Sequence, residues 1–188
     1  DGGAASRRHA LRQVQGWFED DPATYLEAGL EIALLDQEAG MGGTSVRDIR
    51  ALLARCGDAV DPTLRGWAEY LLADGLRTTG DVDEAFEIYE RLAHDPAQPV
   101  ARRGWAYARA ASLLQARAPL EAMGLLNEAL LFDSPALTQQ VALLVDLLLD
   151  GAPQELIEER LALVSEHHPH RCVDIHTRLS DEVYDVLN

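Results

Sequence analysis

The chain has 188 residues, of which 47% are hydrophobic, and a formal net charge of −16 from 32 acidic and 16 basic residues. This composition excludes a disordered tail, and the charge repels nucleic-acid backbones and anionic membranes. The longest apolar run, 141–149, is interrupted by Asp146 and is too short to span a bilayer. We therefore expect a water-soluble protein with neither nucleic acid nor a membrane as its direct partner.

Cysteine and arginine usage indicates a compartment and a source. The two cysteines, Cys56 and Cys172, lie far apart in the chain, so they do not form a disulfide scaffold. We predict a reducing compartment, the cytoplasm. All 16 basic residues are arginine, a bias typical of a high-GC bacterial coding sequence.

The chain reads as helix throughout, because period-2 alternation and clusters of β-branched residues are nearly missing. A first helix is predicted near 4–19, with Leu11, Val14 and Phe18 on one face, and residues 1–21 are expected to be an N-terminal capping element. Prolines then mark the boundaries of the following helices, and the pairs Asp21-Pro22 and Asp61-Pro62 are typical of an N-cap followed by the first helical residue.

An internal repeat follows the first helix. One apolar spacing (i, i+4, i+7) occurs four times at intervals of 36, 37 and 35 residues, and the tetrapeptide RGWA occurs at 65–68 and 103–106. Such a recurrence is typical of stacked helix pairs, each too small to bury its own apolar face. The four copies are Ile49, Leu53, Cys56; Ala85, Tyr89, Leu92; Ala122, Leu126, Ala129; and Ile157, Leu161, Val164.

The copies define four predicted helix pairs and a final helix in a single domain, 1–188. Three glycines, Gly40, Gly42 and Gly43, predict a long turn inside the first pair. The last helix places Val183 and Tyr184 near one apolar stripe and is expected to cap the array. The pairs are 22–61, 62–98, 99–135 and 136–169, and the C-terminal capping helix is 170–188.

The stretch GDVDEAFEIYERLAHDP at 80–96 resembles the second half of a tetratricopeptide repeat (TPR). It has Gly80 and Asp81 at the turn between helices, small Ala85, aromatic Tyr89 and a closing Asp-Pro. The stretch 119–135 is similar, although Ala118-Pro119 replaces the Gly-Asp turn. This resemblance implies an all-α, right-handed α-solenoid of about four TPR-like helix pairs with terminal capping helices. It also implies a scaffold or adaptor that binds another protein and performs no catalysis.

One face of the first helix in each pair is the predicted partner-binding groove. It carries aromatic, acidic and arginine side chains, which suit peptide recognition. The two tryptophans have a competing interpretation, in which the indoles fill the seam between successive helix pairs. The predicted groove residues are Trp67, Tyr70, Asp74, Arg77, Trp105 and Ser112.

The predicted partner is a protein or peptide segment, and the net charge favours one with basic residues. A homodimer is compatible with the apolar run at 141–149, and no cofactor is expected. An alternative function is that of a sensor or regulatory domain of a bacterial transcription or signalling protein, with the groove binding an effector.

A cluster of histidines near the C-terminus, HHPHRCVDIH at 167–176, suggests a third and weaker function. Imidazole and thiolate groups are ligands for zinc and other transition metals, and Cys172 and His176 are one helical turn apart. The spacing matches no established zinc signature, so a solvated turn between helices is the competing interpretation. The candidate ligands are His168, His170, Cys172 and His176.

Overall fold

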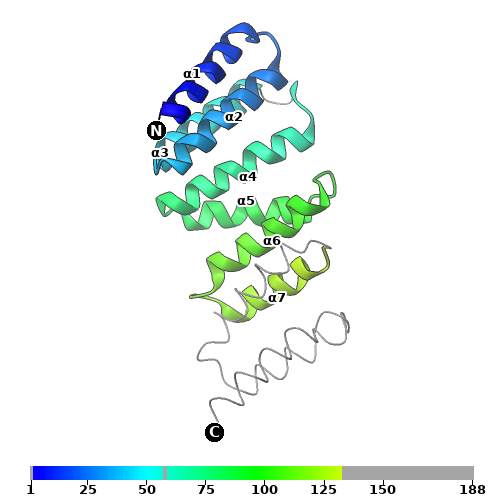
Figure 1. The fold of residues 1–188 in the computed structure, drawn as a ribbon. Coiled ribbons are helices and arrows are strands. Elements are labelled where there is room, and N and C mark those ends of the chain that lie inside the picture. Colours follow the sequence, from blue (N-terminus) through cyan, green and yellow to red (C-terminus); the bar gives the residue numbers. More distant parts are fainter. Residues whose placement is uncertain (1, 57–58, 133–188) are drawn as a thin grey trace. The chain divides into compact units, whose positions relative to one another are not determined.

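The computed structural model of the chain describes residues 2–56 and 59–132, which contain seven α-helices and no strand. Residues 1–110 and 111–188 are two compact units, so that the division falls within the sixth helix. The helices are α1 (Gly2–Trp17), α2 (Pro22–Glu38), α3 (Gly42–Cys56), α4 (Pro62–Thr79), α5 (Val82–His94), α6 (Val100–Leu114) and α7 (Pro119–Leu130) (Figure 1).

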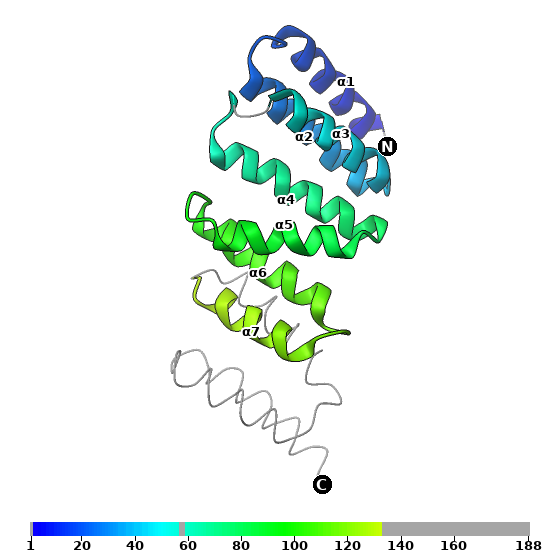
Figure 2. The ribbon, with the colours of Figure 1, turned by 180° about the vertical axis from the view of Figure 1, so that it is seen from behind.

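Helices of the first unit are stacked in chain order. Each of α1 to α4 packs against the next helix, and α2 also contacts α4. The two opposite views agree that α2 lies between α1 and α4 along the stack (Figures 1 and 2). Helices α2 and α3 lie within the predicted pair 22–61, and α4 and α5 lie within the predicted pair 62–98; the division of the chain into repeat pairs stays a prediction. The fourth predicted pair, 136–169, and the C-terminal capping helix, 170–188, lie outside the described residues.

Local sequence signals set the helix boundaries as predicted. Asp21 and Asp61 are N-caps whose carboxylates accept hydrogen bonds from backbone N–H groups, at 3.2 Å from Ala23 and 2.8 Å from Thr63. A proline then opens each helix, where its missing N–H costs nothing. Gly80 ends α4 in the left-handed region, with φ of +95°, so the turn to α5 needs only two residues.

The glycine-rich turn of the first pair is shorter than predicted. Gly42 and Gly43 lie in the first turn of α3, and only residues 39–41 connect it to α2. Of these three glycines, only Gly40 has a positive φ, +76°. A single left-handed residue is sufficient to reverse the chain, so the other two glycines are not needed for the turn.

The repeated apolar spacing is buried in α5 and α7 as predicted, and its fourth copy, Ile157, Leu161 and Val164, lies outside the described residues. Ala85, Tyr89 and Leu92 of α5 are at most 1% exposed, and the three equivalent residues of α7 are fully buried. The first copy departs at one position, because Leu53 is half-buried whereas its neighbour Leu52 is 8% exposed. The stripe on α3 is therefore rotated by about one residue from the stripe on α5.

Gly66 of the first RGWA lies where the turn between α5 and α6 docks on α4. A Cβ atom at this position would overlap the carboxamide of buried Gln98. Gln98 donates from Nε2 to the Pro62 carbonyl at 3.1 Å, and Arg102 donates to Gln98 Oε1 at 2.8 Å. Gly104 of the second RGWA is likewise buried. The glycine of the first tetrapeptide is thus required by the close approach of the following turn.

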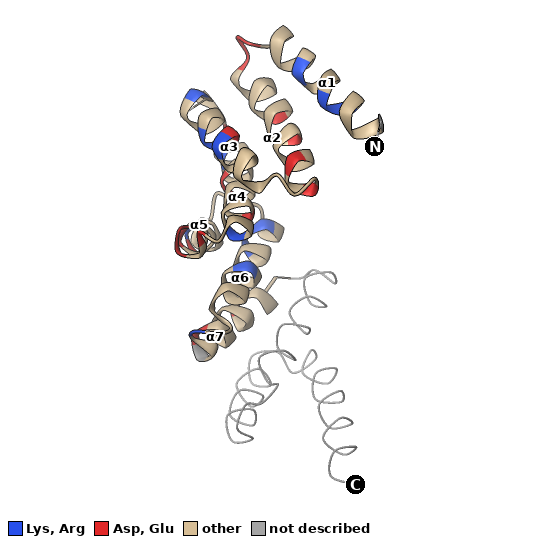
Figure 3. Cartoon of the chain, turned by 90° about the vertical axis from the view of Figure 1, so that its left-hand side faces the viewer, with Lys and Arg blue, Asp and Glu red and all other residues tan. Residues whose placement is uncertain are grey.

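Two ion pairs join α1 to α2. Arg7 pairs with Glu31, and Arg8 pairs with Asp36, whose side chain is only 7% exposed. Arginines on α1 and acidic residues on α2 are visible on these neighbouring helices in Figure 3. Phe18 was expected on the apolar face of this helix, but that prediction is wrong: α1 ends at Trp17, and Phe18 is 47% exposed.

Candidate functional site

The four predicted groove residues of α4 share one face of that helix. Trp67, Tyr70, Asp74 and Arg77 follow each other at spacings of three or four residues, and all four are half-buried. Their partial exposure allows contact with a partner while neighbouring helices restrict their rotamers. Trp105 of α6 is also half-buried.

Asp74 is the centre of a polar network that joins three helices. The Tyr89 hydroxyl of α5 donates a hydrogen bond of 2.6 Å to Asp74 Oδ1. The Nε atoms of Arg77 on α4 and Arg109 on α6 lie 3.6 and 3.5 Å from the same oxygen. A carboxylate held by two cations and a hydroxyl has few alternative rotamers, so the side chains around it are pre-oriented.

Two tyrosines form the aromatic part of this network. The rings of Tyr70 and Tyr89 meet edge to face, with centroids 5.5 Å apart and an interplanar angle of 68°. Burial, followed by the negative charge of Asp74, raises the pKa of both phenols above the ordinary value. Both hydroxyl groups therefore remain protonated at neutral pH and can donate hydrogen bonds.

Sequence reasoning placed three members of this network together and missed two. The shared face of α4 predicts Tyr70, Asp74 and Arg77 together, whereas Tyr89 belongs to the predicted apolar stripe of α5 and the sequence pattern does not indicate Arg109. The Tyr89 ring is indeed fully buried, but its hydroxyl extends to Asp74. The available signal for Arg109 was its position one helical turn after Trp105.

All six predicted groove residues stay predictions as partner contacts. Trp67 and Trp105 are neither fully buried nor exposed, so both the groove and the seam interpretation remain open for the two indoles. Ser112 is half-buried and belongs to the second unit, whereas the face on α4 belongs to the first.

The described part of the chain holds neither a cluster of possible metal ligands nor a helix able to cross a membrane. No three His, Cys, Asp or Glu side chains of residues 2–56 and 59–132 are grouped as a metal site would require. His168, His170, Cys172 and His176 lie outside these residues. None of the helices described combines the length and apolar content needed to cross a bilayer. Cys56 is a free, buried thiol whose pKa is raised by burial, as expected for a core cysteine.

The fold matches solved structures of TPR-like repeats. A Podosopora anserina protein assigned as a kinesin light chain, with nearly identical TPR-like repeats, superposes with a TM-score of 0.61 at 19% identity, over 89% of this chain and 90% of that chain. A single-substitution variant of the same protein matches with a TM-score of 0.61 at 18% identity over the same shares. No protein-family model matches the sequence, and no curated protein matches it significantly.

These likenesses establish the class of the fold. At 19% identity, a TM-score of 0.61 across nine-tenths of the neighbour reflects a shared backbone arrangement. The chain is an all-α solenoid of TPR-like helical repeats, and the predicted resemblance to TPR proteins is confirmed at the level of the fold. What the neighbour binds is not transferred by this similarity.

Proposed function

We propose that this protein is a protein-interaction module that binds a peptide or partner segment on the face carrying Trp67, Tyr70, Asp74 and Arg77 of α4 and Trp105 of α6. TPR-like folds generally mediate protein–protein interaction, which supports the class of function. The observation that carries the proposal is the network around Asp74, because it holds half-exposed aromatic and arginine side chains in fixed orientations. Pre-oriented groups lose little entropy on binding.

The proposed partner is a segment with basic residues flanking its contact region. The net charge of −16 attracts such a segment over a distance of about one Debye length, roughly 10 Å at 0.1 M salt. At the face itself, Arg77 and Arg109 surround Asp74, so the segment is expected to contact this spot through polar or aromatic groups. The long-range charge would then attract the basic flanks of the partner, and the local contacts would recognise its polar or aromatic groups.

A binding comparison among tryptophan variants tests this proposal. Peptides selected from a random library against the wild-type protein would be measured by fluorescence polarisation with purified variants. We expect the double variant Trp67→Ala/Trp105→Ala to weaken binding by about tenfold or more, as truncating central interface aromatics does. Trp17→Ala is the matched control, because Trp17 is 74% exposed and lies on α1 outside the face.

Folding effects are separated from binding effects by a second variant and by thermal melting. Arg77→Gln removes a side chain that is 35% exposed and leaves Arg109 beside Asp74, so it should keep the melting temperature while weakening binding severalfold. If the double tryptophan variant melts several degrees lower while Arg77→Gln binds normally, the tryptophans form a structural seam and the proposed face is wrong. Affinity that does not fall with added salt would contradict a basic partner.

A further inference from the structure

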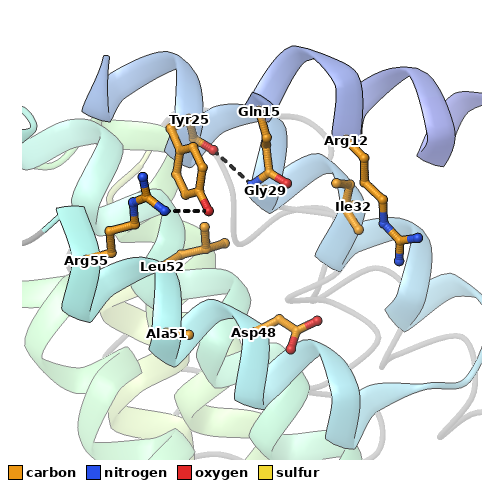
Figure 4. A pocket seen from close by; sticks show the side chains of 9 residues that line it. All are labelled: Arg12, Gln15, Tyr25, Gly29, Ile32, Asp48, Ala51, Leu52 and Arg55. Carbon is orange, nitrogen blue, oxygen red and sulfur yellow. Dashed lines mark hydrogen bonds between the residues drawn. The ribbon is translucent and has the colours of Figure 1, made fainter. Parts of the chain in front are cut away.

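A cavity lies near the N-terminal end of the described chain. A cavity of about 390 Å³ opens between α1, α2 and α3, away from the network around Asp74 (Figure 4). Its volume falls within the range of small-molecule sites, roughly 300–1,000 Å³. The proposed function does not use this cavity, and none of its lining residues belongs to the face on α4.

One wall of the cavity is held in place by polar contacts. Gln15 of α1 donates from Nε2 to the Tyr25 carbonyl at 3.3 Å. The Arg55 guanidinium of α3 lies 4.0 Å from the centroid of the Tyr25 ring and donates to the Tyr25 hydroxyl at 3.1 Å. Arg55 is also paired with Glu19 at 3.0 Å. These contacts join three helices, so this wall is preformed.

The floor of the cavity is apolar and lies close to the backbone of α2. Ile32 and Leu52 line it and are each 8% exposed. Gly29 permits this approach, because a Cβ atom there would lie only 2.6 Å from Leu52 Cδ1. A ligand with a compact apolar body would cover this floor and displace water from it.

Arg12 of α1 is the distinctive charged residue of the lining. It makes no hydrogen bond or ion pair with any described residue. Every other arginine of residues 2–56 and 59–132 takes part in a hydrogen bond, an ion pair or another electrostatic contact. Figure 4 shows its side chain extending beside Ile32. In so acidic a protein, an arginine without a carboxylate partner leaves a site for an external anion. The engaged arginines are those at 7, 8, 47, 50, 55, 65, 77, 91, 102, 103, 109 and 117.

We propose that this cavity binds an organic carboxylate with a compact apolar body. The carboxylate would pair with Arg12, and the apolar body would rest on Ile32 and Leu52. Asp48, the acidic residue of the lining, is already paired with Arg47 at 2.8 Å, so the lining keeps a net positive charge. A free carboxylic acid and the C-terminal residue of a peptide share this chemistry.

Calorimetric titration with phenylacetate and its neutral isostere phenylacetamide tests the proposal. We expect saturable binding of phenylacetate with Kd on the order of 0.1–1 mM, and binding of the amide about tenfold weaker. Chemical shifts that change on titration should map to α1, α2 and α3. Equal affinity for the acid and the amide, no saturable binding, or shifts mapping elsewhere would each overturn the proposal.

Three variants locate the bound acid. Arg12→Gln should weaken phenylacetate binding about tenfold. Arg7→Gln should leave it unchanged, because Arg7 lies on the same helix outside the lining. Ala51→Phe places a ring in the cavity from an exposed position of α3 and should abolish binding. If Arg12→Gln binds as the wild type does, Arg12 is not the anion partner and the proposal fails.

The tripeptide Ala-Ala-Phe, as the free acid and as the C-terminal amide, distinguishes the two sources of the carboxylate. If the tripeptide acid binds at least fivefold more tightly than phenylacetate and the tripeptide amide does not bind, the ligand is a chain terminus. Equal or weaker binding of the tripeptide acid would identify a small free acid. Both results support the cavity as a carboxylate site, provided that Arg12→Gln reduces the affinity.

Discussion

Tyr89 of α5 and Tyr25 of α2 occupy two helix junctions that are built very differently. The Tyr89 ring is fully buried between α4 and α5, and its hydroxyl is bonded to Asp74. The Tyr25 ring is half-buried, lies under the Arg55 guanidinium and borders a cavity of about 390 Å³. One junction is filled by its own side chains, and the other leaves space that a ligand can occupy.

The difference follows from how each helix is attached. α5 buries Ala85, Tyr89 and Leu92 almost completely, so its contacts are mainly apolar. α1 has only half-buried apolar residues at Leu11 and Val14, and two arginine ion pairs join it to α2. Large apolar side chains fill the space between packed helices by interdigitating, and α1 contributes few of them. A ligand-sized space is therefore expected where a helix brings few buried apolar side chains to the junction.

The largest expected effect comes from removing the buried tyrosine. Tyr89→Ala should lower the free energy of unfolding by about 3–5 kcal/mol, because it leaves a cavity and removes the bond to Asp74. Tyr25→Ala should cost only about 1 kcal/mol, since the ring is half-buried. Urea denaturation followed by circular dichroism measures both. Equal losses would show that the two junctions are packed alike, contrary to the comparison.

An intermediate effect is expected at the ion pairs of α1. Arg8→Gln should destabilise the protein by about 2 kcal/mol, because Asp36 would remain buried without its cation. Arg7→Gln should cost less than about 1 kcal/mol, because that arginine side chain is 59% exposed. The melting temperatures of the two variants, measured at low and high salt, check this order. A larger loss for Arg7→Gln would mean that the exposed pair, not the buried one, holds α1.

The smallest expected effect concerns the glycine of RGWA. Gly66→Ala should cost about 1–2 kcal/mol, because the new methyl group displaces Gln98 and breaks its hydrogen bonds. Gly124→Ala on α7 should instead stabilise by about 0.5–1 kcal/mol, since no described atom lies near its Cβ position and alanine favours helix. Unfolding of both variants is measured in urea.

A double variant checks the cause of the Gly66 effect. In the Gln98→Ala background, Gly66→Ala should carry no further cost, because the carboxamide that it would displace is gone. A cost that persists in that background would place the constraint on the backbone of α4 instead of on the Gln98 contact.

Much of the fold was readable in the sequence because its signals are local. Asp-Pro pairs cap α2 and α4, Gly80 ends α4, and the i, i+4, i+7 stripe on α5 is buried as predicted. These features depend on neighbouring residues along one helix, so the sequence is sufficient to predict them. Tertiary packing then reinforces them. The failures came where local signals were ambiguous, as at Gly42 and Gly43, which permit either a loop or a helix start.

The candidate site was only partly predictable for a related reason. Residues of one helix face, such as Tyr70, Asp74 and Arg77, are set by the helical period alone. Arg109 joins them from α6, and a contact between residues 35 apart in sequence depends on how far the helices twist against each other. The cavity beside Arg12 depends on the same geometry, because it is the space that three helices leave between them.

The sequence by itself therefore determined an all-α repeat, the N-caps of α2 and α4, the buried stripe of α5 and one polar face on α4. Periodicity and capping are properties of successive residues, and these are encoded locally. Only the tertiary structure decided that Tyr89 and Arg109 fix Asp74, that Gln98 covers Gly66, and that Arg12 stands beside an open cavity. Those outcomes depend on distances between helices, which arise from the packing of all the side chains at once.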